Sequence, residues 1–191
     1  KIQELTTKGG IKVWLVEEHA VPLMAMRFAF DGGSAQNPVG KEGVAHFLTG
    51  MMDEGAGDLK SQAFQKRTEE IAMRMSFEDT KDHLYGSFET LTENRKAAVD
   101  LLKLAINQPR FDVDAVDRVR DQIVAGLAYA ARDPNKVASE RWFASAFEGH
   151  PYGRPSNGTA ETLKAITRDD LEAYRKRVFA KESLRVVVVG D

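Results

Sequence analysis

The sequence predicts an α+β fold, with a mainly antiparallel sheet covered by helices. Two observations favour this class. Segments with the alternating apolar pattern of strands come in neighbouring pairs, and segments with helical periodicity come in runs. A doubly wound fold would instead alternate strands with helices along the chain. With 191 residues, of which 42% are hydrophobic, the chain is long enough for one domain with a sizeable core.

Strands are expected where apolar residues alternate with polar ones. The first two flank Lys8, Gly9 and Gly10, a turn signal that predicts a hairpin. The third ends at Gly32 and Gly33. The strands are predicted at residues 2–7, 11–19, 21–31, 74–82, 83–91 and 184–189. The two central segments follow each other directly and form a second strand pair.

Helices are expected where apolar residues recur every three to four positions. Gly55 and Gly57 end the first helix, Ser61 is expected to cap the second, and Pro109 stops the third. Thr159 and Thr167 each precede an acidic first turn, a signal for a capped helix start. The helices are predicted at residues 42–54, 61–75, 93–108, 112–134, 135–147, 159–166 and 167–179.

Composition excludes several classes of function. The net charge is -2, and no basic stripe indicates a nucleic-acid partner. The apolar runs are far shorter than a membrane span, so direct membrane insertion is not expected. The chain has no cysteine, so it has neither disulfides nor a thiolate metal site.

Four stretches in a characteristic order carry a resemblance to a known family. They read "GIKVWLVEEHAVPLMAMRFAFDGGSAQNP", "GVAHFLTGMMDEGAG", "FEGHPYGRPSNGT" and "ITRDDLEAYRKRVFAKESLRVVVVGD". Together they resemble the pitrilysin, insulysin and mitochondrial processing peptidase superfamily, whose inverted zinc motif is H-x-x-E-H. The resemblance covers essentially the whole chain. It implies a metallopeptidase domain of this type, with residues 1–191 as the single N-terminal domain of a longer, two-domain subunit.

The second stretch departs from the motif at its functional positions. In the motif, two histidines four residues apart on a helix bind zinc, and the glutamate between them acts as the general base. His46 matches the first histidine, whereas Thr49 stands at the base and Gly50 at the second histidine. The resemblance places the third ligand, a glutamate, at Ala125 or Gly126, and neither residue can bind a metal.

These departures predict a non-catalytic member of the superfamily with no catalytic residue, metal or other cofactor of its own. One imidazole cannot replace a full ligand set that is worth on the order of 10 kcal/mol. Loss of the base alone would lower the rate roughly 10²- to 10⁴-fold. His46 is expected to be a hydrogen-bonded or cleft-lining histidine, and the helix that carries it is expected to remain as a packing element.

The resemblance also implies a partner. In heterodimeric members one subunit holds zinc and the other has lost it, so we expect this chain to pair with a zinc-bearing homologue as part of a metalloendopeptidase. The partner and the chain would enclose a peptide substrate in a shared chamber. Exported bacterial relatives imply a periplasmic location, with a soluble cytoplasmic one as the alternative. Two other functions remain open: a purely structural subunit of a larger membrane complex, and an active metallopeptidase with an atypical site.

One further segment is a candidate for substrate contact. In the superfamily the substrate adds as a strand to a sheet edge near the motif helix, and the matching residues here are Arg74, Met75, Ser76, Phe77 and Glu78. Edge addition needs only free backbone N–H and C=O groups, so it does not depend on the metal. Met75 and Phe77 are predicted on one face, and Ser76 and Glu78 on the other. The alternative is an ordinary strand that is paired on both sides.

Overall fold

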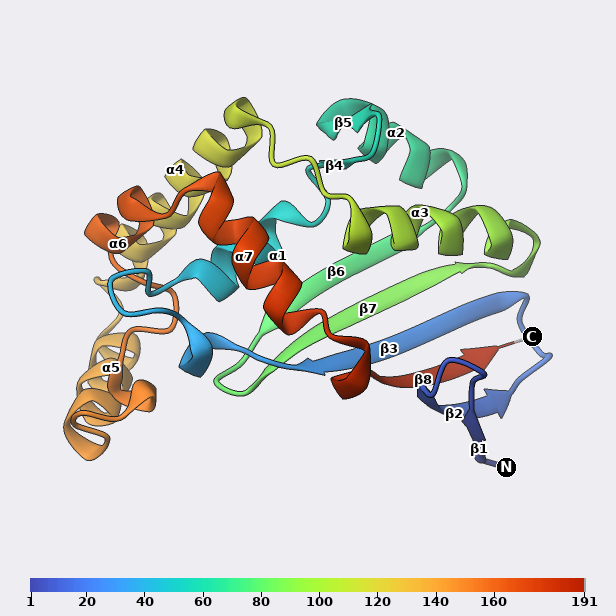
Figure 1. The fold of residues 1–191 in the computed structure, drawn as a ribbon, viewed down its shortest axis with the longest axis horizontal. Coiled ribbons are helices and arrows are strands. Elements are labelled where there is room, and N and C mark those ends of the chain that lie inside the picture. The colour runs from blue at the N-terminus through green and yellow to red at the C-terminus, as the bar shows by residue number, and fades with distance from the viewer. Residues whose placement is uncertain (191) are drawn as a thin grey trace.

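The computed structural model describes residues 1–190 as a sheet with helices over one face (Figure 1). The six strands lie in the order β1-β2-β8-β3-β7-β6, and all neighbours are antiparallel except β2 and β8. Their bounds are β1 (Gln3–Thr6), β2 (Lys12–Glu17), β3 (Leu23–Asp31), β6 (Arg74–Asp79), β7 (His83–Leu91) and β8 (Arg185–Gly190). A second, small sheet pairs β4 (Gly55–Ala56) with β5 (Leu59–Lys60). The predicted α+β class and its mainly antiparallel sheet are confirmed.

The helices cover the face of the sheet that is turned toward the core. In Figure 1, α1, α3 and α7 lie along this face, and α5 lies beyond the turn between β6 and β7, far from both ends of the chain. The helices are α1 (Val44–Met51), α2 (Ser61–Glu70), α3 (Arg95–Asn107), α4 (Val113–Ala130), α5 (Pro134–Ala146), α6 (Ala160–Ala165) and α7 (Arg168–Val178). None of the helices in residues 1–190 is long and apolar enough to cross a bilayer.

Alternation along each strand separates the two faces of the sheet. Phe28 on β3 pairs with Gly86 on β7 and points into the core, where it is 4% exposed. A Cβ on Gly86 would lie 2.0 Å from the Phe28 ring, so this position needs glycine because of the ring that crosses it. On the opposite face, Trp14, Val187 and Val189 remain exposed.

Several predicted elements are confirmed with their caps. The first hairpin forms with Gly10 at a φ of 83°, and β6 and β7 form the second strand pair. Thr159 and Thr167 accept hydrogen bonds from Thr162 N and Asp170 N, so both helices begin with a capping box.

Other predicted boundaries were wrong. Residues 42–54 form a helix only from Val44 to Met51, because Gly43 has a left-handed φ of 95° at the N-cap. The second helix ends at Glu70, and residues from Arg74 onward join the sheet. Ser61 is the first residue inside α2 and caps nothing, since its hydroxyl donates to the Glu54 carboxylate instead.

Candidate functional site

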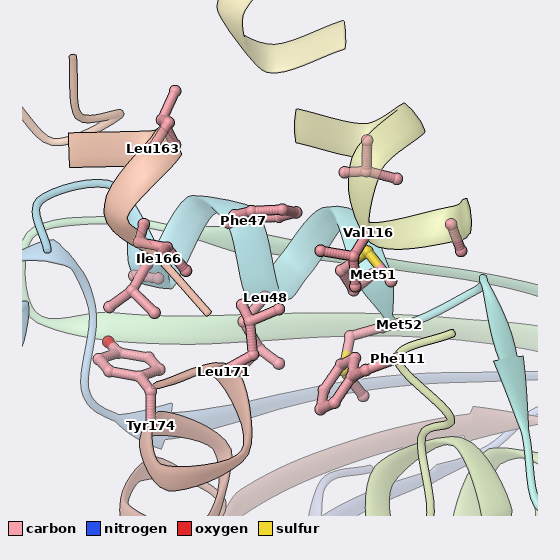
Figure 2. Close-up of a cluster of buried hydrophobic side chains, with 14 of the residues drawn as sticks. Phe47, Leu48, Met51, Met52, Phe111, Val116, Leu163, Ile166, Leu171 and Tyr174 are labelled. Atoms are coloured by element: carbon pink, nitrogen blue, oxygen red, sulfur yellow. The ribbon is translucent and has the colours of Figure 1, made fainter. Parts of the chain in front are cut away.

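Helix α1, which carries the degenerate motif, is buried along most of its length. Figure 2 shows its apolar side chains surrounded by side chains from α4, α6 and α7. Phe47 and Leu48 are fully buried and Met51 is 1% exposed. Burying a side chain of this size stabilises a fold by about 1.5–3 kcal/mol. The helix is therefore retained by packing that does not involve the motif positions.

The N-terminus of α1 is fixed against the loop that follows η3 (Pro151–Gly153). A Cβ on Gly43 would lie 2.7 Å from the Asn157 carbonyl oxygen, so the two backbones touch. In the same region the Arg154 guanidinium donates to the carbonyl oxygens of Ala35 (3.0 Å) and Asn37 (2.8 Å). The "GHPYGRPSNG" loop thus positions the start of the motif helix.

His46 is oriented by a carboxylate from the neighbouring strand. Its Nδ1 lies 3.0 Å from Oδ1 of Asp79, the last residue of β6, and the Asp79 side chain is only 5% exposed. Because a carboxylate accepts, this contact makes Nδ1 the donor and leaves Nε2 for another partner. The imidazole itself is 38% exposed, so the ring is open to solvent.

The positions of the base and of the second histidine offer no replacement chemistry. The Thr49 hydroxyl donates to the His46 carbonyl oxygen at 2.8 Å, which satisfies it within the helix. At Gly50, a Cβ would lie 3.2 Å from Cγ1 of Val119 on α4. A side chain at Gly50 would therefore need Val119 to shift by a few tenths of an ångström.

His46 and Gly126 line one cavity of about 320 Å³. The other residues that line it are Gln122, Ile123, Leu127, Ala130, Lys136 and Asn157. Gly126 is exposed, and a Cβ there would meet no atom within 4 Å. Ala125, the other position proposed for the third ligand, does not line this cavity. Of the two positions, Gly126 is therefore the one that faces His46.

The cavity lacks the ligands that zinc requires. Its lining contains one imidazole and one ammonium group but no carboxylate. Within the described residues 1–190, no group of three or more His, Cys, Asp or Glu side chains is arranged to hold a metal ion. Zinc sites need at least three protein ligands of these types. The residues around His46 do not fit zinc, and no catalytic step through a metal follows from them.

Strand β6, the candidate for substrate contact, lies at the edge of the large sheet. Within residues 1–190 it pairs with β7 alone, so the alternative of a strand paired on both sides was wrong. Met75 and Phe77 are half-buried toward the helices, whereas Arg74, Ser76 and Glu78 are exposed. Its C-terminal end contacts α1 through Asp79 and His46, so the free edge leads directly to the degenerate motif.

Hydrogen bonding at the turn indicates which backbone groups of β6 face outward. Thr80 N donates to His83 O at 2.9 Å, so the N–H of Thr80 points toward β7. N–H direction alternates along a strand, so Ser76 and Glu78 also point toward β7. Met75, Phe77 and Asp79 then carry the outward N–H and C=O groups.

Sequence reasoning missed two parts of this site. Asp79 has no motif spacing relative to His46, and only the packing of α1 against β6 brings the two together. Asn157, in the loop between η3 and α6, is more than a hundred residues from His46 in sequence yet lines the same cavity. The "GHPYGRPSNG" loop was part of the family resemblance, but the sequence did not indicate that this loop lies beside His46.

Fold and site together define a peptidase-like domain, and a solved structure shares its architecture. That structure, described as a peptidase M16 inactive domain from Pseudomonas fluorescens, superposes with a TM-score of 0.94 at 28% identity and covers 100% of this chain and 47% of that one. The family model described as "Insulinase (Peptidase family M16)" matches residues 12–160, so this chain belongs to that family. The resemblance found in the sequence is thereby confirmed.

Two relatives illustrate the range of the family. The "Non-peptidase homolog YmxG" of Helicobacter pylori is 27% identical over 184 residues, which are 96% of this chain and 43% of the relative. The "Mitochondrial-processing peptidase subunit beta" of Dictyostelium discoideum is 24% identical over 186 residues, 97% of this chain and 39% of the relative. The chain thus spans less than half the length of the curated relatives it matches.

Proposed function

We propose that this chain is a non-catalytic peptidase-like domain that encloses and holds a peptide for a zinc-bearing homologous subunit. The observation that carries the proposal is the environment of His46. The imidazole is held by Asp79, Thr49 is bonded within the helix, and Val119 packs against Gly50. Zinc chemistry at this position would need ligands and a base that these residues do not supply.

Relatives support the non-catalytic part of this proposal. The relative named as a non-peptidase homologue and the solved structure described as an inactive domain both support a non-catalytic role. The similarity to a processing peptidase subunit beta supports pairing, because a named subunit works within an assembly. In this proposal zinc belongs to the partner, and the present chain is half of a two-domain subunit.

The free edge of β6 supplies the peptide contact. Peptides that add a strand to a sheet edge gain affinity from main-chain hydrogen bonds and specificity from pockets beside the edge. Outward groups at Met75, Phe77 and Asp79 offer such bonds, and Asp79 also holds the His46 ring. An extended peptide on β6 would therefore run past His46 at the C-terminal end of the strand.

Reconstitution tests the proposed function. The full-length protein is purified alone and together with an H-x-x-E-H homologue from the same source, and hydrolysis of a quenched peptide library is measured with zinc content. We expect no hydrolysis and less than stoichiometric zinc for this protein alone, and a higher rate for the homologue when the protein is added. Chelator-sensitive hydrolysis by this protein alone, abolished by His46→Ala, would overturn the proposal. Stable co-purification with a membrane complex and no effect on the homologue would favour a purely structural role.

A further inference from the structure

A second cavity lies between α5 and the loop that fixes the start of α1. Helix α5 begins with Pro134 at its first position, and the Asp133 carboxylate accepts from Asn135 N at 2.9 Å as an N-cap. None of its residues is fully buried, so the helix lies at the margin of the fold. The space beside it has a volume of about 410 Å³.

An aromatic ring with an ammonium group over it lines this cavity. Phe143 of α5 is half-buried, and Nζ of Lys81 lies 5.2 Å from the centre of its ring. Lys81 Nζ also donates to the carbonyl oxygens of Tyr152 (2.8 Å) and Arg154 (3.3 Å). An ammonium group has three N–H donors, so Lys81 keeps one for a ligand. Desolvation, and then the charge of Arg154, lower the pKa of Lys81, against the opposite effect of Asp79 and Asp82, and an added anion would favour the charged ammonium.

The charged side chains that line the cavity favour an anion. Arg141 makes no hydrogen bond or ion pair with any residue in the described part of the chain, so its guanidinium is available. Arg154 already donates to two carbonyl oxygens and lies 3.7 Å from Glu42. Glu140 is the one acidic residue in the lining. Guanidinium and ammonium groups placed together bind carboxylates by charge-assisted hydrogen bonds.

This cavity adjoins the one beside His46. Asn157 lines both cavities. Along α5, Lys136 lines the cavity beside His46, and Arg141 lines the cavity that Phe143 also lines. Lys81 follows Asp79, the end of β6, by two residues. A peptide that is bound to the β6 edge and continues past His46 would therefore reach the cavity that Phe143 lines.

We propose that the cavity beside α5 is a peptide subsite that takes an apolar side chain on Phe143 and a carboxylate between Lys81 and Arg141. This inference rests on the proposed peptide capture and adds the class of substrate: peptides with an acidic group next to an apolar residue. The carboxylate can come from an acidic side chain or from the C-terminus of the peptide. Both sources present the same chemistry to the two cationic groups.

The first experiment tests the cavity without the edge strand. N-acetyl-phenylalanine and its amide are titrated into the full-length protein, and the signal is the tryptophan fluorescence change that disappears in Trp142→Phe. Trp142 suits this purpose because its ring lies 5.0 Å from that of Phe143. We expect the acid to bind about fivefold more tightly than the amide, as for a partly exposed charge pair. Equal binding of acid and amide, or no signal from either, would overturn the subsite.

Variants test which charges act. Arg141→Gln should weaken binding of the acid about fivefold and leave the amide unchanged, whereas Glu140→Gln should strengthen binding of the acid. The matched control is Arg132→Gln, an exposed arginine just before α5 that does not line the cavity. If Arg132→Gln and Arg141→Gln weaken binding equally, the effect is one of overall charge, and the subsite is wrong.

Extended peptides separate this inference from the proposed function. A series with one glutamate moved through each position, with glutamine as the reference, is titrated with a free and with an amidated C-terminus. Tighter binding of peptides with glutamate at one position, lost in Arg141→Gln, shows that an acidic side chain supplies the carboxylate. Tighter binding of peptides with a free C-terminus shows that the terminal carboxylate supplies it. Peptides that bind with no carboxylate preference would overturn the subsite and leave edge capture standing. Binding of the small acid with no binding of any peptide would overturn edge capture and keep an acid-binding cavity.

Discussion

Zinc binding should return to α1 when the missing ligands are restored, and the structure states which changes are needed. Thr49→Glu and Gly50→His supply the base and the second imidazole, and Gly126→Glu supplies the third ligand. The Gly50 change would place its new Cβ 3.2 Å from Cγ1 of Val119, so it also needs a change of a few tenths of an ångström in the position of Val119. Gly126→Glu needs no such change, since nothing lies within 4 Å of its new Cβ. His46 already presents Nε2, because Asp79 holds Nδ1.

The expected magnitude follows from ligand linkage. A ligand at 100 times its Kd stabilises the folded state by about 2.7 kcal/mol. For a domain of this size, 1 kcal/mol corresponds to roughly 2–4 °C in Tm, so zinc should raise Tm by roughly 5–11 °C. Without Gly126→Glu the site has two histidines and no distal carboxylate. That variant should show little or no zinc-dependent shift.

Calorimetric titration with zinc and thermal melts with and without metal test this prediction. Two reference variants are compared with the fully restored one: the first lacks only Gly126→Glu, and the second carries His46→Ala in addition. Equal zinc affinity without Gly126→Glu would refute the assignment of Gly126 as the third position. A folded variant with all ligands restored and no zinc binding would refute the mapping of the motif onto His46 and Gly50.

Three further predictions concern packing, a buried hydrogen bond and the sheet edge. Gly86→Ala should lower Tm by roughly 4–12 °C, because its Cβ would overlap the Phe28 ring and overpacking costs about 2–3 kcal/mol, whereas Gly126→Ala should not lower it. The buried Tyr174 hydroxyl donates to Gly33 O at 2.7 Å, so Tyr174→Phe should cost about 1–2 kcal/mol in chemical denaturation, and Tyr129→Phe, at an exposed site, close to nothing. Burial raises the pKa of Tyr174 above its usual 10.0, so the neutral hydroxyl stabilises the fold below pH 10 and this stabilisation is lost as the pH rises above 10. The unchanged protein should show this loss, and Tyr174→Phe should not. For the edge, N-methylation of those alternate peptide amides that face β6 should weaken binding about fivefold per lost hydrogen bond, whereas N-methylation of the intervening amides should leave binding unchanged. Equal effects at all positions would exclude strand addition to β6.

Which features the sequence could predict depends on whether the signal is local. Strand pairs, the caps at Thr159 and Thr167 and the buried stripe of α1 depend on neighbouring residues, so periodicity and capping rules found them. The insertion of β8 between β2 and β3 and the pairing of His46 with Asp79 depend on contacts between distant segments. No spacing rule in a single sequence carries that information. The start of α1 was misjudged for a related reason, since Gly43 combines a left-handed φ with a close approach to the backbone of Asn157, a residue far away in sequence.

The alternation of backbone groups along β6 decides how the edge can be tested by mutation. Proline removes an N–H, so Ser76→Pro should break a bond to β7 and destabilise the hairpin, because the N–H of Ser76 points inward by the alternation that begins at Thr80. Met75→Pro removes an outward N–H and should weaken peptide binding with a smaller effect on folding. The metal site and the edge therefore depend on different atoms. Side chains at Thr49 and Gly50 can change without moving the backbone of β6, so the peptide capture that we propose does not require the zinc ligands that this chain lacks.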